Sequence, residues 1–179
     1  MKNLQQGMLI NKAGKGRYLN PDAPEKLIKY VTRMDGKHKG GLAAWGGLGI
    51  TEYQDIDVII GQFYLAQKTH TRGGNFGRYA DHEIYSFSQE EEYAIHKNRV
   101  DIDKVAREMA YDFYRNDHCQ VVYGVHAPDK KGKHTHIHFV VNTVNFQTGG
   151  KRRESMRQTK KRGLRFQKIV LDEINSLYR

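Results

Sequence analysis

Apolar and polar side chains alternate most regularly in the segment Val121–Asn142, and this alternation predicts two strands joined by a turn. Successive side chains of a strand point to opposite sides, so the apolar members of both strands share one face. They are Val121, Tyr123, Val125, Ile137, Phe139 and Val141. The connecting segment Ala127–Thr135 is polar and contains turn-forming proline and glycine residues. We expect a hairpin whose apolar face packs against helices.

A helical period of apolar residues recurs in other parts of the chain. The clearest example is Asp101–Asn116, in which Asp101 is suited to cap the first turn. Helices are also predicted from the start signal at Asn20–Glu25 to about Met34, over Gln54–Lys68 and over Leu164–Tyr178. In the first of these, Tyr30 lies about 60° from the apolar stripe, a position at which most tyrosines are packing residues.

Shorter apolar segments predict the remaining strands. Gln6–Ile10 is one, and His82–Ser88 is apolar on both faces, which favours a central position in the sheet. The glycine-rich segment Met34–Ile50 is predicted to be a mobile loop, Gln89–Arg99 a loop or short helix, and the second hairpin strand to continue to Phe146. These elements predict one α+β domain over residues 1–179: a central antiparallel β-sheet flanked by helices, mainly on one face.

Composition narrows the class of protein. The chain of 179 residues is 38% hydrophobic, contains no apolar run as long as a membrane span, and lacks the apolar core of a signal peptide. Its single cysteine, Cys119, excludes a thiolate zinc finger and an intramolecular disulfide. We therefore expect a cytoplasmic location and no membrane partner.

The formal net charge of +10 points to an anionic partner, and the distribution of basic residues indicates nucleic acid. Between Lys151 and Arg165, eight basic residues accompany one acid. Several basic loop residues lie beside aromatic ones such as Tyr18, Phe76 and Tyr79, a combination that suits single-stranded nucleic acid. The predicted DNA-binding residues are Lys12, Lys15, Arg17, Arg33, Arg72, Arg78, Lys151, Arg152 and Arg153.

The polar face of the hairpin carries His126, His136 and His138. Residues at i and i+2 of a strand project to the same side, and a symmetric turn places His126 opposite His136 and Gly124 opposite His138. Three imidazoles leave coordination positions open, as in catalytic metal sites, and suit Zn²⁺, Ni²⁺, Co²⁺ or Mn²⁺. A metal beside a basic groove indicates phosphodiester chemistry. The alternative is one or two surface histidines on an edge strand.

The same residues resemble the histidine motif of the HUH endonuclease superfamily: His126, Asp129, and His134 to Asn142. Within it the chain is similar to the P-type mobilisation relaxases, which include the T-DNA border endonuclease. Their tyrosine motif is matched by Leu27–Arg33, and their intermediate strand end by Ser86 and Phe87. The resemblance extends from Gln6 to about Gly150.

This resemblance implies a ferredoxin-like or RRM-like sheet and a site-specific, metal-dependent DNA nicking-joining endonuclease. Tyr30 would be the nucleophile that forms a 5′-phosphotyrosine, with Mg²⁺ or Mn²⁺ as the working ion. His134 would deprotonate the tyrosine or orient the complex. Asp129, Glu83 and Asn142 are expected to lie behind the metal ligands and to orient them. The implied partners are single-stranded DNA at an origin of transfer, accessory relaxosome proteins and a type IV secretion coupling protein. We expect the chain to be the N-terminal part of a longer relaxase.

Two other functions fit the same residues. One is a rolling-circle replication initiator or a single-strand transposase of the same superfamily, although the position of Tyr30 before the histidines favours a relaxase. The other is a non-catalytic module that binds single-stranded nucleic acid and uses its histidines for a structural metal.

Overall fold

The computed structural model describes residues 5–11, 17–37, 41–52, 55–70, 76–128 and 134–176. Its strands are β1 (Met8–Asn11), β2 (Leu42–Leu48), β3 (Ala80–Ser86), β4 (Val121–His126) and β5 (His136–Asn142). Its α-helices are α1 (Ala23–Val31), α2 (Ile56–Lys68), α3 (Gln89–Asn98), α4 (Ile102–Asp112) and α5 (Met156–Ser176), and α4 continues into a π-helical turn, Phe113–Asp117. The predictions for Lys12, Lys15, Arg72 and Asp129 lie outside the described residues.

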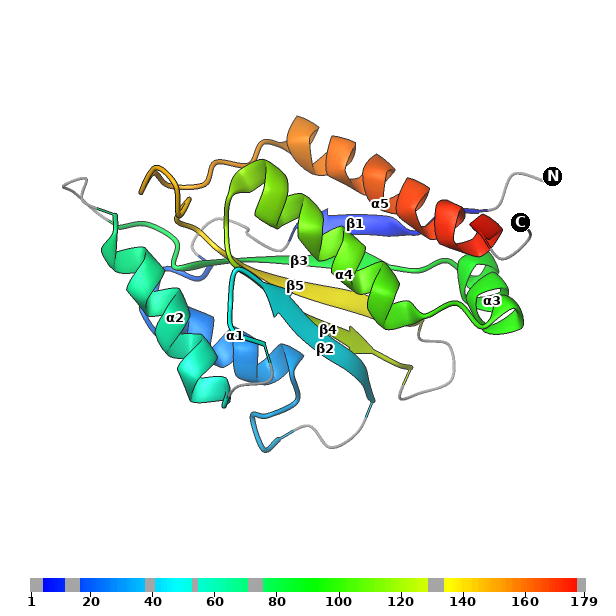
Figure 1. Cartoon of the computed structure of the whole chain (residues 1–179), viewed down its shortest axis with the longest axis horizontal. Coiled ribbons are helices and arrows are strands. Elements are labelled where there is room, and N and C mark those ends of the chain that lie inside the picture. Colours follow the sequence, from blue (N-terminus) through cyan, green and yellow to red (C-terminus); the bar gives the residue numbers. More distant parts are fainter. Residues whose placement is uncertain are drawn as a thin grey trace.

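Within the described ranges the strands form one antiparallel sheet in the order β1-β3-β5-β4-β2 (Figure 1). The α+β class is therefore confirmed. The hairpin β4–β5 has the predicted register, with His126 opposite His136 and Gly124 opposite His138. The predicted central strand is β3, which lies between β1 and β5. Asp101 caps α4 by accepting hydrogen bonds from two backbone N–H groups.

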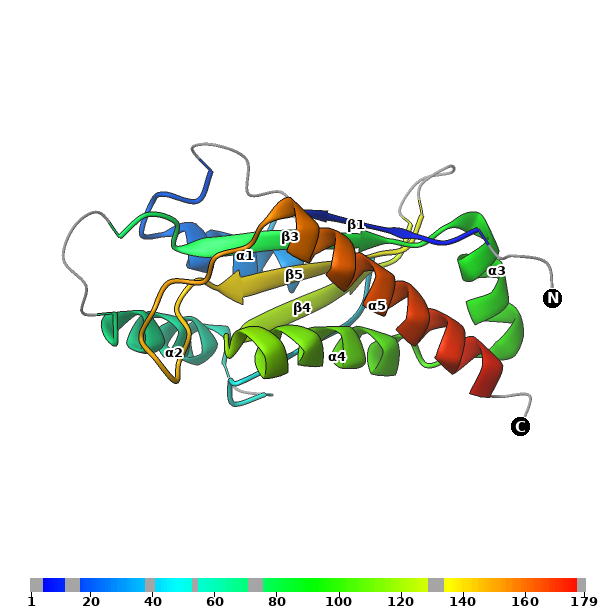
Figure 2. The ribbon, with the colours of Figure 1, turned by 90° about the horizontal axis from the view of Figure 1, so that it is seen from above.

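The apolar face of the hairpin forms the larger core. Its side chains pack with those of α4 and α5, including Met109, Phe113 and Phe166. The opposite face is covered in part by α1 and α2, whose Ile28, Val31, Ile59 and Phe63 pack against Val122 and Val140. Figure 2 shows α4 and α1 on opposite sides of β4 and β5. The prediction that helices lie mainly on one face is wrong, because α1 packs on the histidine face.

The glycine-rich segment predicted as a mobile loop contains the strand β2, which pairs with β4 along Leu42–Leu48. Its glycines are required by close packing. A Cβ at Gly46 would lie 2.7 Å from the Tyr123 hydroxyl oxygen, and one at Gly47 would lie 2.5 Å from the Val121 carbonyl oxygen. Only glycine lets this strand approach β4 so closely.

The C-terminal boundaries also differ from the prediction. The strand β5 ends at Asn142, and only an isolated bridge joins Val144 to Lys151. The helix α5 begins at Met156 instead of Leu164. Consequently, five of the eight basic residues of the run lie on a helix that packs against the sheet, and one of them, Arg162, is buried.

Arg152 and Arg162 are the buried members of that run, each with a side chain that is 2% exposed. Arg152 forms ion pairs with four carboxylates, Asp81, Glu83, Asp117 and Glu154. Arg162 forms ion pairs with Asp112, Asp117 and Glu154. The buried and fully paired guanidinium contradicts the prediction that Arg152 contacts DNA. It connects β3, the π-helical turn and Glu154, which precedes α5.

None of the helices in the described ranges combines the length and apolar character that a bilayer crossing needs.

Candidate metal centre

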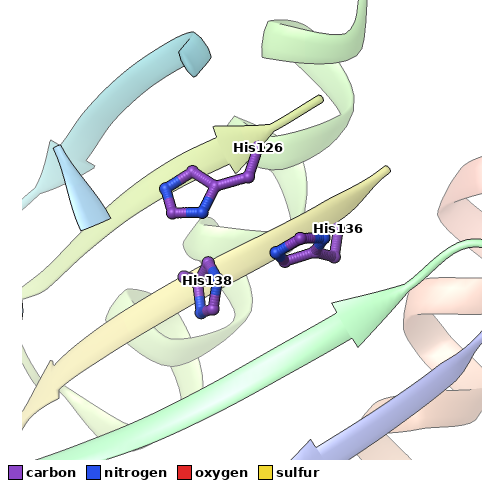
Figure 3. Close-up of side chains that lie close together, drawn as sticks. All are labelled: His126, His136 and His138. Atoms are coloured by element: carbon purple, nitrogen blue, oxygen red, sulfur yellow. The ribbon is translucent and has the colours of Figure 1, made fainter. Parts of the chain in front are cut away.

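Three histidine side chains converge at one end of the hairpin. Among the described residues, His126, His136 and His138 form a group whose ring nitrogens, one from each, lie within 4.8 Å of one another. Figure 3 shows the three rings on the same side of β4 and β5. His126 and His138 are buried, and His136 is partly exposed. The predicted cluster is therefore present, at a spacing that one divalent ion can bridge.

The end of α1 lies directly on this cluster because Gly124 leaves room for it. A Cβ at Gly124 would collide with the carbonyl oxygen of Val31. The same carbonyl accepts a hydrogen bond from Nε2 of His126 at 2.8 Å. As a result the Tyr30 ring stands edge-on to two of the histidines, with centroid distances of 5.8 Å to His126 and 5.4 Å to His138. Tyr30 thus lies at the cluster, which its helical periodicity alone did not indicate.

Arg33 brings a positive charge to the same place. It follows α1 in a left-handed conformation, with φ of 58°. Its Nη2 donates a hydrogen bond to Nδ1 of His126 at 3.0 Å, and its guanidinium carbon lies 5.4 Å from the Tyr30 ring centroid. The Arg33 guanidinium therefore occupies the position next to Nδ1 of His126.

The hydrogen bonds define which ring nitrogens are free to coordinate. Nδ1 of His136 donates to the carbonyl oxygen of His134 at 2.9 Å, so its Nε2 carries the lone pair. Nε2 of His138 is buried and has no hydrogen-bond partner within the described residues. Burial lowers the pKa of His138 far below its ordinary value, and the neighbouring His82, His126 and His136 lower it further. The ring of His138 therefore stays neutral. A buried ring nitrogen without a partner beside two further imidazoles fits a divalent metal ion.

A comparison with known families agrees with this geometry. The family model of the relaxase nuclease domain, MobA/VirD2-like, matches residues 30–174. The match starts at Tyr30 and contains all three histidines, and it covers far more than half of the 179 residues. The chain belongs to this relaxase family. It therefore has the nuclease domain of a DNA relaxase, as the resemblance of its motifs predicted. No curated protein matches the chain.

Two residues that contact the histidine cluster were not among the predicted site residues. His82 on β3 lies within 2.8 Å of His138, from Nε2 to Nδ1, and the Tyr18 hydroxyl lies 3.1 Å from His82 Nδ1. The sequence shows that His82 begins a strand, but the pairing of that strand with β5 is needed to place it beside His138.

Glu83 and Asn142 do not lie beside the clustered histidines, where they were predicted to orient the metal ligands. Glu83 points to the opposite face of the sheet from His82, and its carboxylate accepts a hydrogen bond from Arg152 at 2.8 Å. Asn142 lies at the far end of β5, where it donates to the carbonyl oxygen of Phe63 and to the side chain of Gln120. Both residues hold elements of the fold together, which corrects the predicted roles.

His134 is held by an acid on α3. Its Nδ1 lies 2.8 Å from Oε2 of Glu92, whose other oxygen accepts a hydrogen bond from the Thr135 backbone N–H. Burial alone would raise the pKa of Glu92, but these hydrogen bonds hold it below its ordinary value. The pair is an imidazole oriented by a carboxylate, and the role of His134 as base stays a prediction.

The other predicted DNA-binding residues differ in exposure. Arg17 and Arg153 are exposed. Arg78 forms an ion pair with Asp81 at 2.7 Å. The Lys151 ammonium lies 3.6 Å from the ring centroid of Phe76, and burial together with Arg78 lowers the pKa of Lys151 to about 8.

Proposed function

We propose that this relaxase domain cuts and rejoins single-stranded DNA at an origin of transfer by transesterification, with Tyr30 as the nucleophile. The observation that carries the proposal is the position of the Tyr30 ring, 5.4 Å from His138 and 5.8 Å from His126. A hydroxyl at that site is adjacent to the only group of described histidines, cysteines and acids that can hold a metal ion.

In the proposed reaction the phenolic oxygen of Tyr30 attacks the scissile phosphorus. A tyrosine–phosphorus bond forms and the bond from phosphorus to the 3′ oxygen breaks, which leaves a 5′-phosphotyrosine and a 3′-hydroxyl. The phenol loses its proton, and the leaving 3′ oxygen gains one. The number of phosphodiester bonds is unchanged, so a 3′-hydroxyl can attack the phosphotyrosine and rejoin the strand.

His126, His136 and His138 would hold Mg²⁺ or Mn²⁺ in function, and Zn²⁺, Ni²⁺ or Co²⁺ also suit three imidazoles. The bound ion supplies charge neutralisation at the non-bridging phosphate oxygens. His126 accepts a hydrogen bond from Arg33 through the nitrogen that would bind the ion. Arg33 must therefore swing away, and its released donors are then available for a DNA phosphate.

We assign the proton of Tyr30 to His134, for which the Glu92 carboxylate is a fixed partner 2.8 Å away. A carboxylate on one ring nitrogen fixes the orientation of the imidazole, and a general base must be held in a defined orientation. This contact supports the proposed role of His134.

The proposed biological role is to begin and end the transfer or mobilisation of a plasmid or integrative element. Single-stranded DNA would be bound by basic side chains, among the described residues Arg17, Arg33, Arg78, Lys151 and Arg153. Accessory relaxosome proteins and a secretion coupling protein are the partners that this role requires.

The proposal can be tested with end-labelled single-stranded DNA fragments that tile the region around the gene. With Mn²⁺ present, we expect one fragment to yield a shortened labelled strand and a covalent protein–DNA adduct. A second, unlabelled fragment with the same site should exchange with the first and give a recombined strand, because the reaction rejoins. Retarded DNA without any shortened strand would instead identify a non-catalytic binding module. Cleavage restricted to a replication origin would identify a rolling-circle initiator.

A further inference from the structure

A third strand contributes a histidine to the cluster from outside the hairpin. His82 lies on β3, and its ring stacks on that of His138 with a centroid distance of 5.0 Å and an interplanar angle of 27°. Both residues are buried, with exposed fractions of 7% for His82 and 3% for His138. Nε2 of His82 and Nδ1 of His138 are 2.8 Å apart, so one of the two nitrogens carries the shared proton.

Tyr18 holds the other side of the His82 ring. Its hydroxyl oxygen lies 3.1 Å from Nδ1 of His82, and the rings meet edge to face. The backbone of Tyr18 has a left-handed φ of 60°, and its carbonyl oxygen accepts a hydrogen bond from the Tyr79 N–H. Fixed contacts therefore position this hydroxyl in spite of an unfavourable backbone conformation.

The chain of two hydrogen bonds has two possible directions. In the first, Tyr18 donates to His82 and His82 donates to Nδ1 of His138, so the His138 proton is on Nε2. That N–H would be a buried donor without an acceptor among the described residues. In the second, His138 donates from Nδ1 to His82, and His82 donates from Nδ1 to the Tyr18 oxygen. Nε2 of His138 then carries a lone pair that faces the other histidines.

We propose that His82, held by Tyr18, is a positioning residue that fixes His138 in the tautomer with its lone pair on Nε2, ready to bind the divalent ion. The inference rests on the proposed metal site and is independent of the Tyr30 reaction. The role is that of an outer partner of a metal-binding imidazole, which orients the ring and makes it a better ligand. Here the outer partner is itself an imidazole instead of the acid that the sequence suggested at Glu83.

Mn²⁺ affinity measured by calorimetry tests this proposal. The His82→Leu variant removes the acceptor, and we expect Mn²⁺ affinity to fall about 10- to 100-fold. In His82→Gln the side-chain carbonyl can accept from His138 Nδ1, so we expect affinity within a few-fold of the wild type. Tyr18→Phe should lose less than His82→Leu, because His82 itself remains. The matched control is His96→Leu, an exposed histidine on α3, which should leave the affinity unchanged.

Imidazole ¹⁵N NMR of the metal-free wild type provides a readout that does not depend on the folding of any variant. We expect a protonated Nδ1 and a bare Nε2 on His138, and in His82→Leu a shift of the proton toward Nε2. Protonated Nε2 on His138 in the wild type would overturn the proposal. So would an unchanged Mn²⁺ affinity in folded His82→Leu. A wild type that binds no Mn²⁺ would refute both the metal site and the ligand role of His138. Absence of DNA cleavage by Tyr30 would refute the proposed reaction but would leave the role of His82 unaffected.

Discussion

At the residue scale, the cluster contains a cation of its own. The Arg33 guanidinium donates to His126 at 3.0 Å and lies above the Tyr30 ring. A metal ion that uses this nitrogen of His126 must displace it. The charge that opposes a metal ion favours a DNA phosphate, so we expect Arg33 to couple metal binding to DNA binding.

We predict that Arg33→Met raises Mn²⁺ affinity in the absence of DNA by about tenfold, equivalent to roughly 1.4 kcal/mol, because a charge-assisted hydrogen bond no longer competes. The same variant should bind single-stranded DNA more weakly. Calorimetry and DNA titration measure the two effects, and Arg153→Met is the control for loss of an exposed charge. A lower Mn²⁺ affinity in Arg33→Met would contradict this interpretation of Arg33.

Lys151 gives a prediction about pH. Burial and the nearby Arg78 lower the pKa of its ammonium from 10.5 to about 8 in the folded protein. The unfolded chain then binds this proton more tightly than the folded protein does, so the contribution of Lys151 to stability rises between about pH 8 and 10.5. NMR of ¹³C-methylated lysines should show one resonance that titrates near pH 8 and disappears in Lys151→Arg. Titration of every lysine above pH 10 would contradict the prediction.

The sequence predicted the clustering of His126, His136 and His138, because strand alternation and a symmetric turn suffice to bring the three side chains together. It did not predict His82, and it assigned the role of orienting a metal ligand to the adjacent Glu83. The register of β3 against β5 decides which of these two neighbours faces His138, and a shift of one residue reverses every side chain. That register depends on tertiary packing that local pattern does not reveal.

At the element scale, the helices with a clear apolar stripe, α1, α2 and α4, lie close to where the sequence predicted them. The strand β2 was missed because glycines usually indicate turns, whereas Gly46 is needed here by its contact with Tyr123. The helix α5 was predicted too short because its first turns are basic. One of these basic residues, Arg162, is buried because it pairs with partners from distant segments, such as Asp112.

The buried arginines Arg152 and Arg162 should contribute strongly to the stability of the fold. Truncation in Arg152→Ala removes the guanidinium that Asp81 and Glu83 share inside the fold. Among the residues that the structure describes, Asp81 then keeps only its ion pair with Arg78, and Glu83 keeps only the longer contact with Arg162 at 3.6 Å. We predict a loss of about 3–5 kcal/mol in the free energy of unfolding, the cost of breaking a buried ion pair on one side. Urea denaturation measures it. The neighbouring Arg153→Ala, at an exposed position, should change stability by no more than about 0.5 kcal/mol. Equal effects in the two variants would contradict the described network.

At the scale of the whole molecule, only some of the basic side chains behind the net charge of +10 are free of buried ion pairs and can contact DNA. Arg152 and Arg162 are neutralised inside the fold, so exposed basic residues must account for DNA affinity. Arg17 is exposed and adjacent to Tyr18, whose hydroxyl reaches the histidine cluster through His82. Lys104 lies on α4, which covers the other face of the sheet.

We therefore predict that Arg17→Gln and Lys104→Gln differ in their salt dependence. Affinity for single-stranded DNA should fall with salt, and each lost phosphate contact should reduce the logarithmic slope by about 0.7. Arg17→Gln should show this reduction, and Lys104→Gln should retain the wild-type slope. Fluorescence titrations at several salt concentrations measure it, and equal slopes in the two variants would place the DNA elsewhere.

The proposed attack of Tyr30 on DNA beside the three-histidine cluster would leave a covalent adduct, which a denaturing gel detects. With cleavable single-stranded DNA and Mn²⁺, the wild type should form an adduct whose nucleotide-bearing peptide contains Tyr30. Tyr30→Phe keeps the ring that contacts His126 and His138 and removes only the hydroxyl. It should fold, bind Mn²⁺ and bind DNA as the wild type does, yet form no adduct and no shortened strand. An adduct of undiminished yield in Tyr30→Phe, for example one that maps to Tyr18, would contradict the account.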